Sequence, residues 1–240
     1  MRANLFIILI ITFAINFTFA ENYTYKDFLE LYNQGKYQKA ISLILEKKDK
    51  KLSEKYLLAL CYYKIRKYKE SEKLFLEVLN TNAEGFPTCY YYLARINLIY
   101  KNIDKAEKYL EYALSYFPNS SYCYVIKGII DAQKNRKKEA LADFEKAIKL
   151  DNQNHWAYNN YGLFLLRLGN YDKAKELFLK AVNLSPNNPY YWNNLGISQE
   201  NLKEYNEALK SYQKALQLKS DYKKAKINLK RVKDILTKSK

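Results

Sequence analysis

The sequence is poor in the residues on which many catalytic sites and most β-folds depend. Its 240 residues include one histidine, three cysteines, six glycines and four prolines. A single histidine excludes most histidine-based catalytic and zinc sites, and three cysteines cannot form a disulfide framework in a chain this long. Scarce glycine and proline argue against a sandwich or barrel with many tight turns. Since no phosphate-binding glycine loop or HExxH motif is present, we expect no cofactor and no bound metal.

The sequence is rich instead in apolar side chains, in tyrosine and in positive charge. Apolar residues make up 48% of the chain, and 25 residues are tyrosines. Lysine and arginine total 41 against 25 acidic residues, which gives a formal net charge of +16. A chain this apolar is expected to fold around a core rather than remain disordered.

Residues 1–20 have the pattern of a secretory signal peptide. Arg2 is followed by an apolar run over residues 5–15, no charge appears before Glu21, and small residues suit cleavage after Ala20. The alternative is a retained membrane anchor, although about 15 apolar residues are fewer than the ~20 that span a bilayer. We therefore expect export to the periplasm or the surface of a bacterial cell; the frequent Lys, Asn, Ile and Tyr are typical of AT-rich codons.

The rest of the chain is built from internal copies that follow one another at a fixed step. Gly128, Gly162 and Gly196 mark this step, as do Ala174 and Ala208. A period of about 34 residues is typical of repeat proteins in which each unit is one supersecondary element. The predicted units are 21–51, 52–86, 87–120, 121–154, 155–188 and 189–222.

Each unit is predicted to form two helices that pack as a hairpin. In the fifth unit apolar residues recur at helical spacing on both sides of a break at Gly169, and Pro186 ends the second helix. Gly162 and Ala174 allow the two helices to approach closely, while Phe178 fills the space beside them. Because one hairpin of this length cannot bury its apolar face alone, neighbouring hairpins must stack into a continuous core.

This pattern resembles the tetratricopeptide repeat. The residues that carry the resemblance are Tyr90, Leu93, Ala94, Ala106, Ala113 and Pro118 in the third unit, Tyr158, Gly162, Ala174, Phe178, Ala181 and Pro186 in the fifth, and Trp192, Leu195, Gly196, Ala208, Tyr212 and Ala215 in the sixth. Lys127 departs from the pattern, since leucine is usual there. The resemblance implies an all-α fold, a right-handed superhelical α-solenoid of antiparallel hairpins with about six repeats. Residues 223–240 are predicted to add a basic capping helix, with Ala225 and Val232 on its apolar face.

The resemblance also implies that the first helix of each hairpin lines a concave groove, which binds a peptide or partner protein. Tyrosine and tryptophan there would give large contact area at low entropy cost, although many of these tyrosines could instead pack between hairpins. Asparagine amides could pair with a peptide backbone or bridge neighbouring helices. The predicted groove residues are Tyr56, Tyr63, Tyr91, Arg95, Tyr122, Trp156, Asn159, Asn160, Tyr190, Asn193 and Asn194.

The positive charge suggests an alternative partner. Residues 219–240 contain nine basic side chains against Asp221 and Asp234, so this face could bind an anionic envelope polymer or a membrane surface, or could simply be solvated. Export makes nucleic acid an unsuitable target. Apart from this face, a membrane would be reached only through an uncleaved signal segment.

The sequence offers no catalytic constellation. His155 has no Asp or Cys partner at catalytic spacing, and no residues are left to form a catalytic domain. Cys89 and Cys123 fall at equivalent positions of neighbouring units, too far apart for a disulfide, so the three cysteines are predicted to be buried and reduced. We therefore predict an exported, non-catalytic adaptor.

Overall fold

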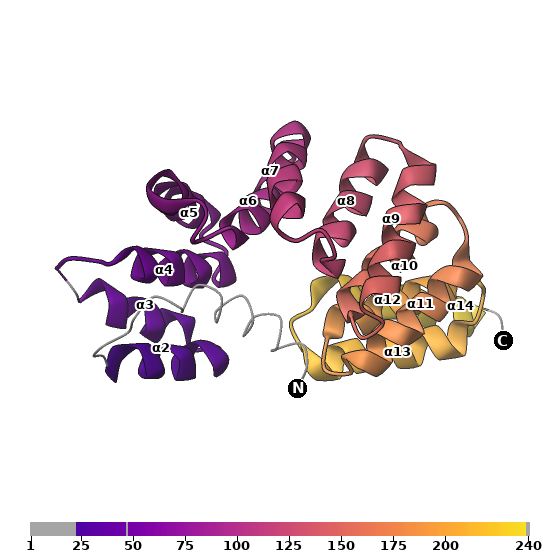
Figure 1. Ribbon diagram of the computed structural model, residues 1–240. Coiled ribbons are helices and arrows are strands. Elements are labelled where there is room, and N and C mark those ends of the chain that lie inside the picture. The colour runs from indigo at the N-terminus through magenta and orange to yellow at the C-terminus, as the bar shows by residue number, and fades with distance from the viewer. Residues whose placement is uncertain (1–22, 47, 239–240) are drawn as a thin grey trace. The chain divides into compact units, whose positions relative to one another are not determined.

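The computed structural model describes residues 23–46 and 48–238, and these residues form thirteen α-helices and no strand (Figure 1). The predicted signal peptide over residues 1–20 lies outside the described residues. The all-α prediction is confirmed. Each of the six predicted units holds two helices, which are α2 (Tyr23–Asn33) and α3 (Tyr37–Leu45), α4 (Leu52–Lys64) and α5 (Tyr68–Asn82), α6 (Thr88–Ile99) and α7 (Ile103–Tyr116), α8 (Ser121–Gln133) and α9 (Lys137–Leu150), α10 (His155–Arg167) and α11 (Tyr171–Leu184), and α12 (Pro189–Asn201) and α13 (Tyr205–Leu218), followed by α14 (Lys223–Lys238).

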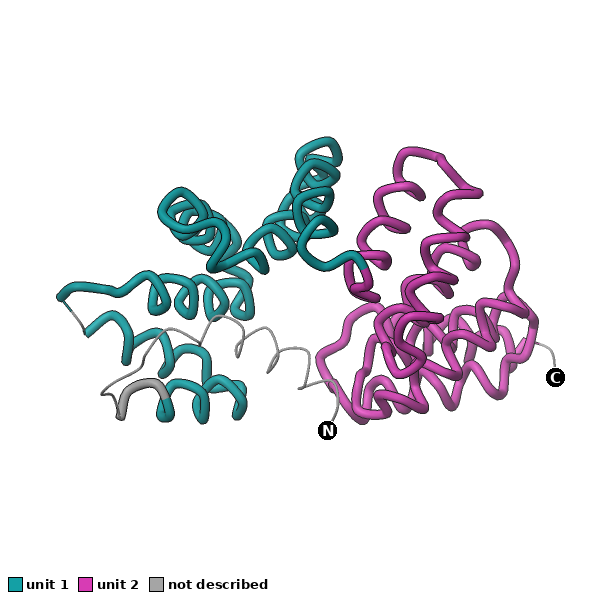
Figure 2. The backbone as a smooth tube through the Cα atoms, viewed as in Figure 1, with its two compact units in different colours: residues 1–118 teal, residues 119–240 magenta. Residues whose placement is uncertain are grey.

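The helices divide into two compact units, residues 1–118 and 119–240 (Figure 2). The first unit contains α2 to α7, and the second contains α8 to α14. Within each unit, every helix contacts the helix that follows it in the chain. In the second unit the first helices of successive hairpins also contact one another, α8 with α10, α10 with α12, and α12 with α14. The packing is therefore that of stacked helical hairpins, as the repeat period predicts.

Close approach of the two helices in a hairpin depends on one glycine in each of the last three pairs. A Cβ atom built on Gly128, Gly162 or Gly196 would lie 2.9, 2.7 or 2.6 Å from the aromatic ring of the second helix. The rings belong to Phe144, Phe178 and Tyr212, which are all fully buried. The predicted role of Gly162 and Phe178 is confirmed.

Every first helix of a hairpin ends in a left-handed residue, although only two of the six are glycine. Residue 169 has φ of 79°, and in the next copy Lys203 has φ of 62°. The amide of the following residue then bonds back to a carbonyl in the last turn, as Glu204 does to Gln199 at 2.9 Å, which is a Schellman turn. The six left-handed residues are Gly35, Arg66, Lys101, Asn135, Gly169 and Lys203.

The last helix, α14, packs against the sixth hairpin. Val232 is fully buried with Ala208 and Tyr212 of α13, and Leu229 and Leu236 pack around them. The apolar face of the predicted capping helix is thus covered, while its lysines face outward.

Candidate functional site

Three large aromatic side chains occupy the same position on successive first helices of the second unit. Tyr122, Trp156 and Tyr190 are each the second residue of their helix, one repeat apart, and we call them the aromatic row. Tyr122 and Trp156 are partly exposed, and Tyr190 is 38% exposed. The rings of Tyr122 and Trp156 stack at 6.2 Å between centroids with an interplanar angle of 20°. The row is therefore a preformed aromatic surface that remains open to solvent.

Side-chain caps fix the start of each helix that carries the row. The hydroxyl of Ser120 accepts a hydrogen bond from the amide of Cys123. Asn154 accepts from the amides of Trp156 and Ala157, each at 3.1 Å. Asn188 accepts from the amide of Tyr190 in the sixth copy. These bonds satisfy amides that the helix leaves unpaired, so they hold the first turn and with it the aromatic residue.

Tyr190 also has a cation beside it. The Nζ atom of Lys219 donates to the Tyr190 hydroxyl at 3.2 Å and lies 5.5 Å from the ring centroid. The ring of Tyr222 meets Tyr190 edge-on at 5.1 Å. Tyr190, the C-terminal member of the aromatic row, therefore has both a positive charge and a second aromatic ring next to it.

The asparagines beside the row bridge neighbouring helices. Asn194 donates to the side-chain oxygen of Asn159 at 2.8 Å, and Asn228 donates to that of Asn193 at 3.0 Å. Asn160 donates to the carbonyl of Trp156 one turn earlier in its own helix. Asn159 and Asn193 are 7% and 2% exposed. The structure thus corrects the placement of Asn159 and Asn193 on an open surface, because the next repeat covers both.

Tyr56 and Tyr91, predicted to line the groove, are also buried. Tyr56 is 2% exposed, with ring contacts to Phe75 and Phe86, and its hydroxyl shares a 2.8 Å hydrogen bond with Thr88. Tyr91 is 7% exposed. Both occupy the repeat position at which Asn159 and Asn193 stand in later copies. Two of the tyrosines predicted to line the groove are therefore core residues of the first unit.

Tyr63 and Arg95 belong to the first unit and are partly exposed. The guanidinium carbon of Arg95 lies 5.1 Å from the Tyr63 ring centroid and 5.4 Å from that of Tyr91. One Arg95 nitrogen donates to the Tyr91 hydroxyl at 3.0 Å. Stacking of this kind holds a cation at the surface of aromatic side chains.

An ionic cluster with two buried carboxylates, in α8, α9 and the turn between them, was not predicted from the sequence. Lys127 bonds both carboxylate oxygens of Asp143, at 2.8 and 3.0 Å, and Arg136 pairs with Asp131 at 2.7 Å. Asp131 and Asp143 are 3% and 6% exposed. Burial and the neighbouring Asp131 raise the pKa of Asp143 to about 6. The signal in the sequence was Lys127 itself, a lysine where the repeat usually has leucine, because a lysine in a packing position needs an acidic partner.

The described residues contain no group of three or more His, Cys, Asp or Glu side chains placed to hold a metal ion. Nδ1 of His155 shares a 2.8 Å hydrogen bond with the Tyr191 hydroxyl, and burial lowers the pKa of His155. The three cysteines are free and buried, as predicted, and burial raises the pKa of Cys123 to about 11. A thiol with such a pKa is a poor nucleophile at neutral pH. None of the helices described here has the length and apolar character needed to cross a membrane.

Family models of the tetratricopeptide repeat match residues 121–154 and 154–221. A model of the anaphase-promoting complex, cyclosome, subunit 3, matches residues 18–78. A TPR repeat-containing protein of Methanocaldococcus jannaschii is 33% identical over 106 residues, and human cilia- and flagella-associated protein 70 is 30% identical over 100 residues. These matches span 44% and 40% of the chain but only 18% and 9% of the two relatives.

Solved structures share the fold at low sequence identity. A thermophilic TPR protein of Thermus thermophilus superposes with a TM-score of 0.67 at 20% identity, over 76% of this chain and 98% of that one. The pilF protein of Pseudomonas aeruginosa gives a TM-score of 0.58 at 24% identity, over 61% of this chain and 67% of its own. Similarity at these identities concerns the fold alone.

Proposed function

We propose that this chain, whose tetratricopeptide repeats indicate a protein-protein interaction scaffold, is a non-catalytic adaptor that binds a peptide or protein partner on the aromatic row of its second unit. The observation that carries this proposal is the contrast in burial along one face. Val125, Asn159 and Asn193 are buried, whereas Tyr122, Trp156 and Tyr190, each three positions earlier on the same helices, remain accessible.

The row suits an extended segment of a partner. Neighbouring helices pack about 10 Å apart. The three rings of the aromatic row therefore span about 20 Å, the length of roughly six residues of extended chain. Tyrosine and tryptophan bury large apolar area at low entropy cost and keep a polar group at the rim. The stacked pair Tyr122 and Trp156 is already ordered before a partner binds, which lowers the entropic cost of association.

We also propose that the adaptor works outside the cytoplasm, in the bacterial envelope or at the cell surface. The support for this is the basic and apolar pattern of residues 1–20. N-terminal sequencing of the chain recovered from an envelope fraction tests it: a first residue at Glu21 is expected, and recovery of the intact chain from the cytosol would contradict it.

The row is tested by site-specific crosslinking in cells. A photoreactive residue in place of Tyr122 should trap a partner, and Trp156→Ala in the same chain should abolish the product. Tyr112, which is 45% exposed in the first unit, supplies the matched control: Tyr112→Ala should leave the crosslink intact.

High salt distinguishes binding by the aromatic row from binding by the basic surface. Binding through the row should survive about 0.5 M salt, because apolar burial is not screened. Capture that collapses in salt and ignores Trp156→Ala would reject the row in favour of an anionic ligand on the basic face.

A further inference from the structure

Helix α14 continues the repeat, but nothing follows it among the described residues to cover it. Ile227 stands one repeat after Asn193, in a column whose earlier members Val125, Asn159 and Asn193 are 0%, 7% and 2% exposed. Ile227 itself is 63% exposed, far more than the others. The same face that later helices cover in each earlier copy is therefore open on α14.

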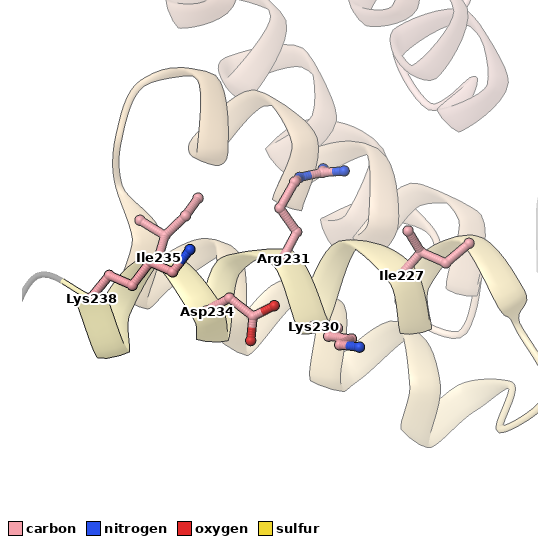
Figure 3. A pocket seen from close by; sticks show the side chains of 6 residues that line it. All are labelled: Ile227, Lys230, Arg231, Asp234, Ile235 and Lys238. Atoms are coloured by element: carbon pink, nitrogen blue, oxygen red, sulfur yellow. The ribbon is translucent and has the colours of Figure 1, made fainter.

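That face forms a groove along the helix (Figure 3). The groove has a volume of about 430 Å³, and we call it the end groove. It lies between two rows of side chains with helical i, i+4 spacing, and helices pack by placing a row of their own side chains into such a channel. One row is Ile227, Arg231 and Ile235, and the other is Lys230, Asp234 and Lys238.

Lys230 decides what kind of helix can lie there. It stands one repeat after Gly196, whose missing side chain leaves room for the Tyr212 ring, 2.6 Å from where a Cβ would be. With a lysine at this place, a second helix of the usual kind, bearing an aromatic residue, cannot approach as closely. The complementary helix must carry a small side chain opposite Lys230.

The charge of the groove selects an acidic partner. Lys230, Arg231 and Lys238 line it against the single carboxylate of Asp234, and Glu200 accepts from Arg231 behind it. A second copy of this chain, with a formal charge of +16, would meet like charge. Opposite charge at an interface favours encounter and suppresses wrong partners. We propose that the end groove of α14 binds an amphipathic helix of a partner protein that is acidic beside its apolar stripe.

A peptide built from the chain's own α13 tests the proposal against the full protein. The probe is residues 205–218 held helical by a hydrocarbon staple between the exposed positions 213 and 217, with Lys210→Glu and Lys214→Glu to make it acidic and Tyr212→Ala to fit Lys230. Fluorescence anisotropy should detect binding of this probe. The same peptide with both lysines retained should bind roughly tenfold more weakly, because two charges change sign.

Variants of α14 locate the contact. Lys230→Glu with Lys238→Glu should abolish binding of the acidic probe and favour the peptide that retains its lysines, whereas Ile227→Ser should weaken the probe several-fold. Lys226→Glu with Lys233→Glu makes the same change of net charge at exposed positions outside the groove, and should retain most of the binding. All of these positions are exposed, so circular dichroism should show unchanged folding.

Three results would overturn the proposal. The first is failure of the full chain to bind the probe. The second is equal loss in the two double variants, together with adsorption to phosphatidylglycerol vesicles, which would make this a general anionic surface. The third is self-association in sedimentation that Ile227→Ser abolishes, which would make the occupant a second copy. Trp156→Ala should leave probe binding unchanged, so failure of the aromatic row and failure of the end groove can be told apart.

Discussion

The two units build the same repeat with different side chains between their hairpins. At one position of the repeat, the first unit has the buried tyrosines Tyr56 and Tyr91, and the second unit has Val125, Asn159 and Asn193. Tyr56 meets the following hairpin through the ring of Phe86 and the hydroxyl of Thr88, whereas Asn159 and Asn193 are bridged to the next helices by amide hydrogen bonds. The backbone period is thus compatible with either apolar or polar joints between copies.

The contact inside each hairpin differs in a similar way. The second unit pairs a glycine with an aromatic ring, as in Gly162 and Phe178. The third copy, in the first unit, has the larger Ala94 and the smaller Leu110 at the corresponding positions, both buried. The second copy has Ala59 with Phe75 there, also buried, so the first unit accepts leucine or an aromatic ring beside its alanine.

The largest expected difference between the units comes from their joints. Tyr56→Ala should lower the free energy of unfolding of the first unit by about 3–5 kcal/mol, since it removes a buried ring and leaves a cavity. Asn159→Ala should cost the second unit only about 1 kcal/mol, because it removes one partly exposed hydrogen bond. Urea unfolding followed by amide hydrogen exchange, which reports on each unit, measures both.

A variant that removes only the Tyr56 hydroxyl provides the control for Tyr56→Ala. Tyr56→Phe keeps the ring and loses only the hydrogen bond to Thr88, so it should cost about 1 kcal/mol. If Tyr56→Ala were as mild as Tyr56→Phe, the joint in the first unit would not be an aromatic core.

The pairing of residue sizes inside hairpins gives the second prediction. Gly162→Ala should destabilise the second unit by about 1–3 kcal/mol, because the new Cβ would lie 2.7 Å from Phe178. This loss reverses the usual gain of about 1 kcal/mol for alanine over glycine in a helix. Adding Phe178→Leu should recover much of it by recreating the Ala94 and Leu110 pair. Thermal unfolding of the single and double variants measures the coupling, and simple additivity would contradict it.

The sequence predicted the hairpins because each copy repeats the same small and aromatic residues at one period. The fit of Gly162 to Phe178 could be read from that spacing alone. The open or buried state of a tyrosine could not, since Tyr56 and Tyr122 were both predicted to line the groove, yet Tyr56 is buried and Tyr122 is partly exposed. That depends on three-dimensional stacking, which periodicity along one helix does not encode.

The ionic cluster and most of the left-handed turns lie where residues depart from the repeat pattern, and the sequence predicted them only in part. Lys127 indicated a polar substitution in the hairpin, but its partner Asp143 lies on another helix, and Asp131 and Arg136 come from the region of the turn between them. The left-handed turns were likewise visible only where a glycine marks them, as at Gly169, because Lys203 adopts the same conformation without one.

The ionic cluster makes the second unit sensitive to pH at a repeat position where the first unit has an uncharged residue. Asn97, which stands one repeat before Asp131, carries no charge and bonds Leu93 and Glu72. The pKa of Asp143 is raised in the folded state to about 6, so the folded chain holds this proton more tightly than the unfolded chain. The resulting stability is present below about pH 4 and is lost as the pH rises through about 6.

Asp143→Asn should therefore flatten the pH dependence of the second unit. Between about pH 5 and pH 7.5 the wild-type chain should lose about 1 kcal/mol relative to the variant, since Lys127 offsets part of the cost of ionisation. Urea midpoints at the two pH values measure the difference. If the stability of both proteins changed equally with pH, a group other than Asp143 would cause the pH dependence.

The smallest expected effect is one in which the two units should agree. Lys101 in the first unit and Lys203 in the second have φ of 61° and 62° at the end of a first helix, a conformation that disfavours any side chain with a Cβ. Lys101→Gly and Lys203→Gly should each raise the free energy of unfolding by about 0.5–1 kcal/mol, since relief of strain exceeds the added freedom of the unfolded chain. Asn135→Gly should gain less, because asparagine tolerates this conformation. Thermal unfolding would show equal gains if the backbone turn is common to both units, and unequal gains would mean that the side-chain joints also strain the turns.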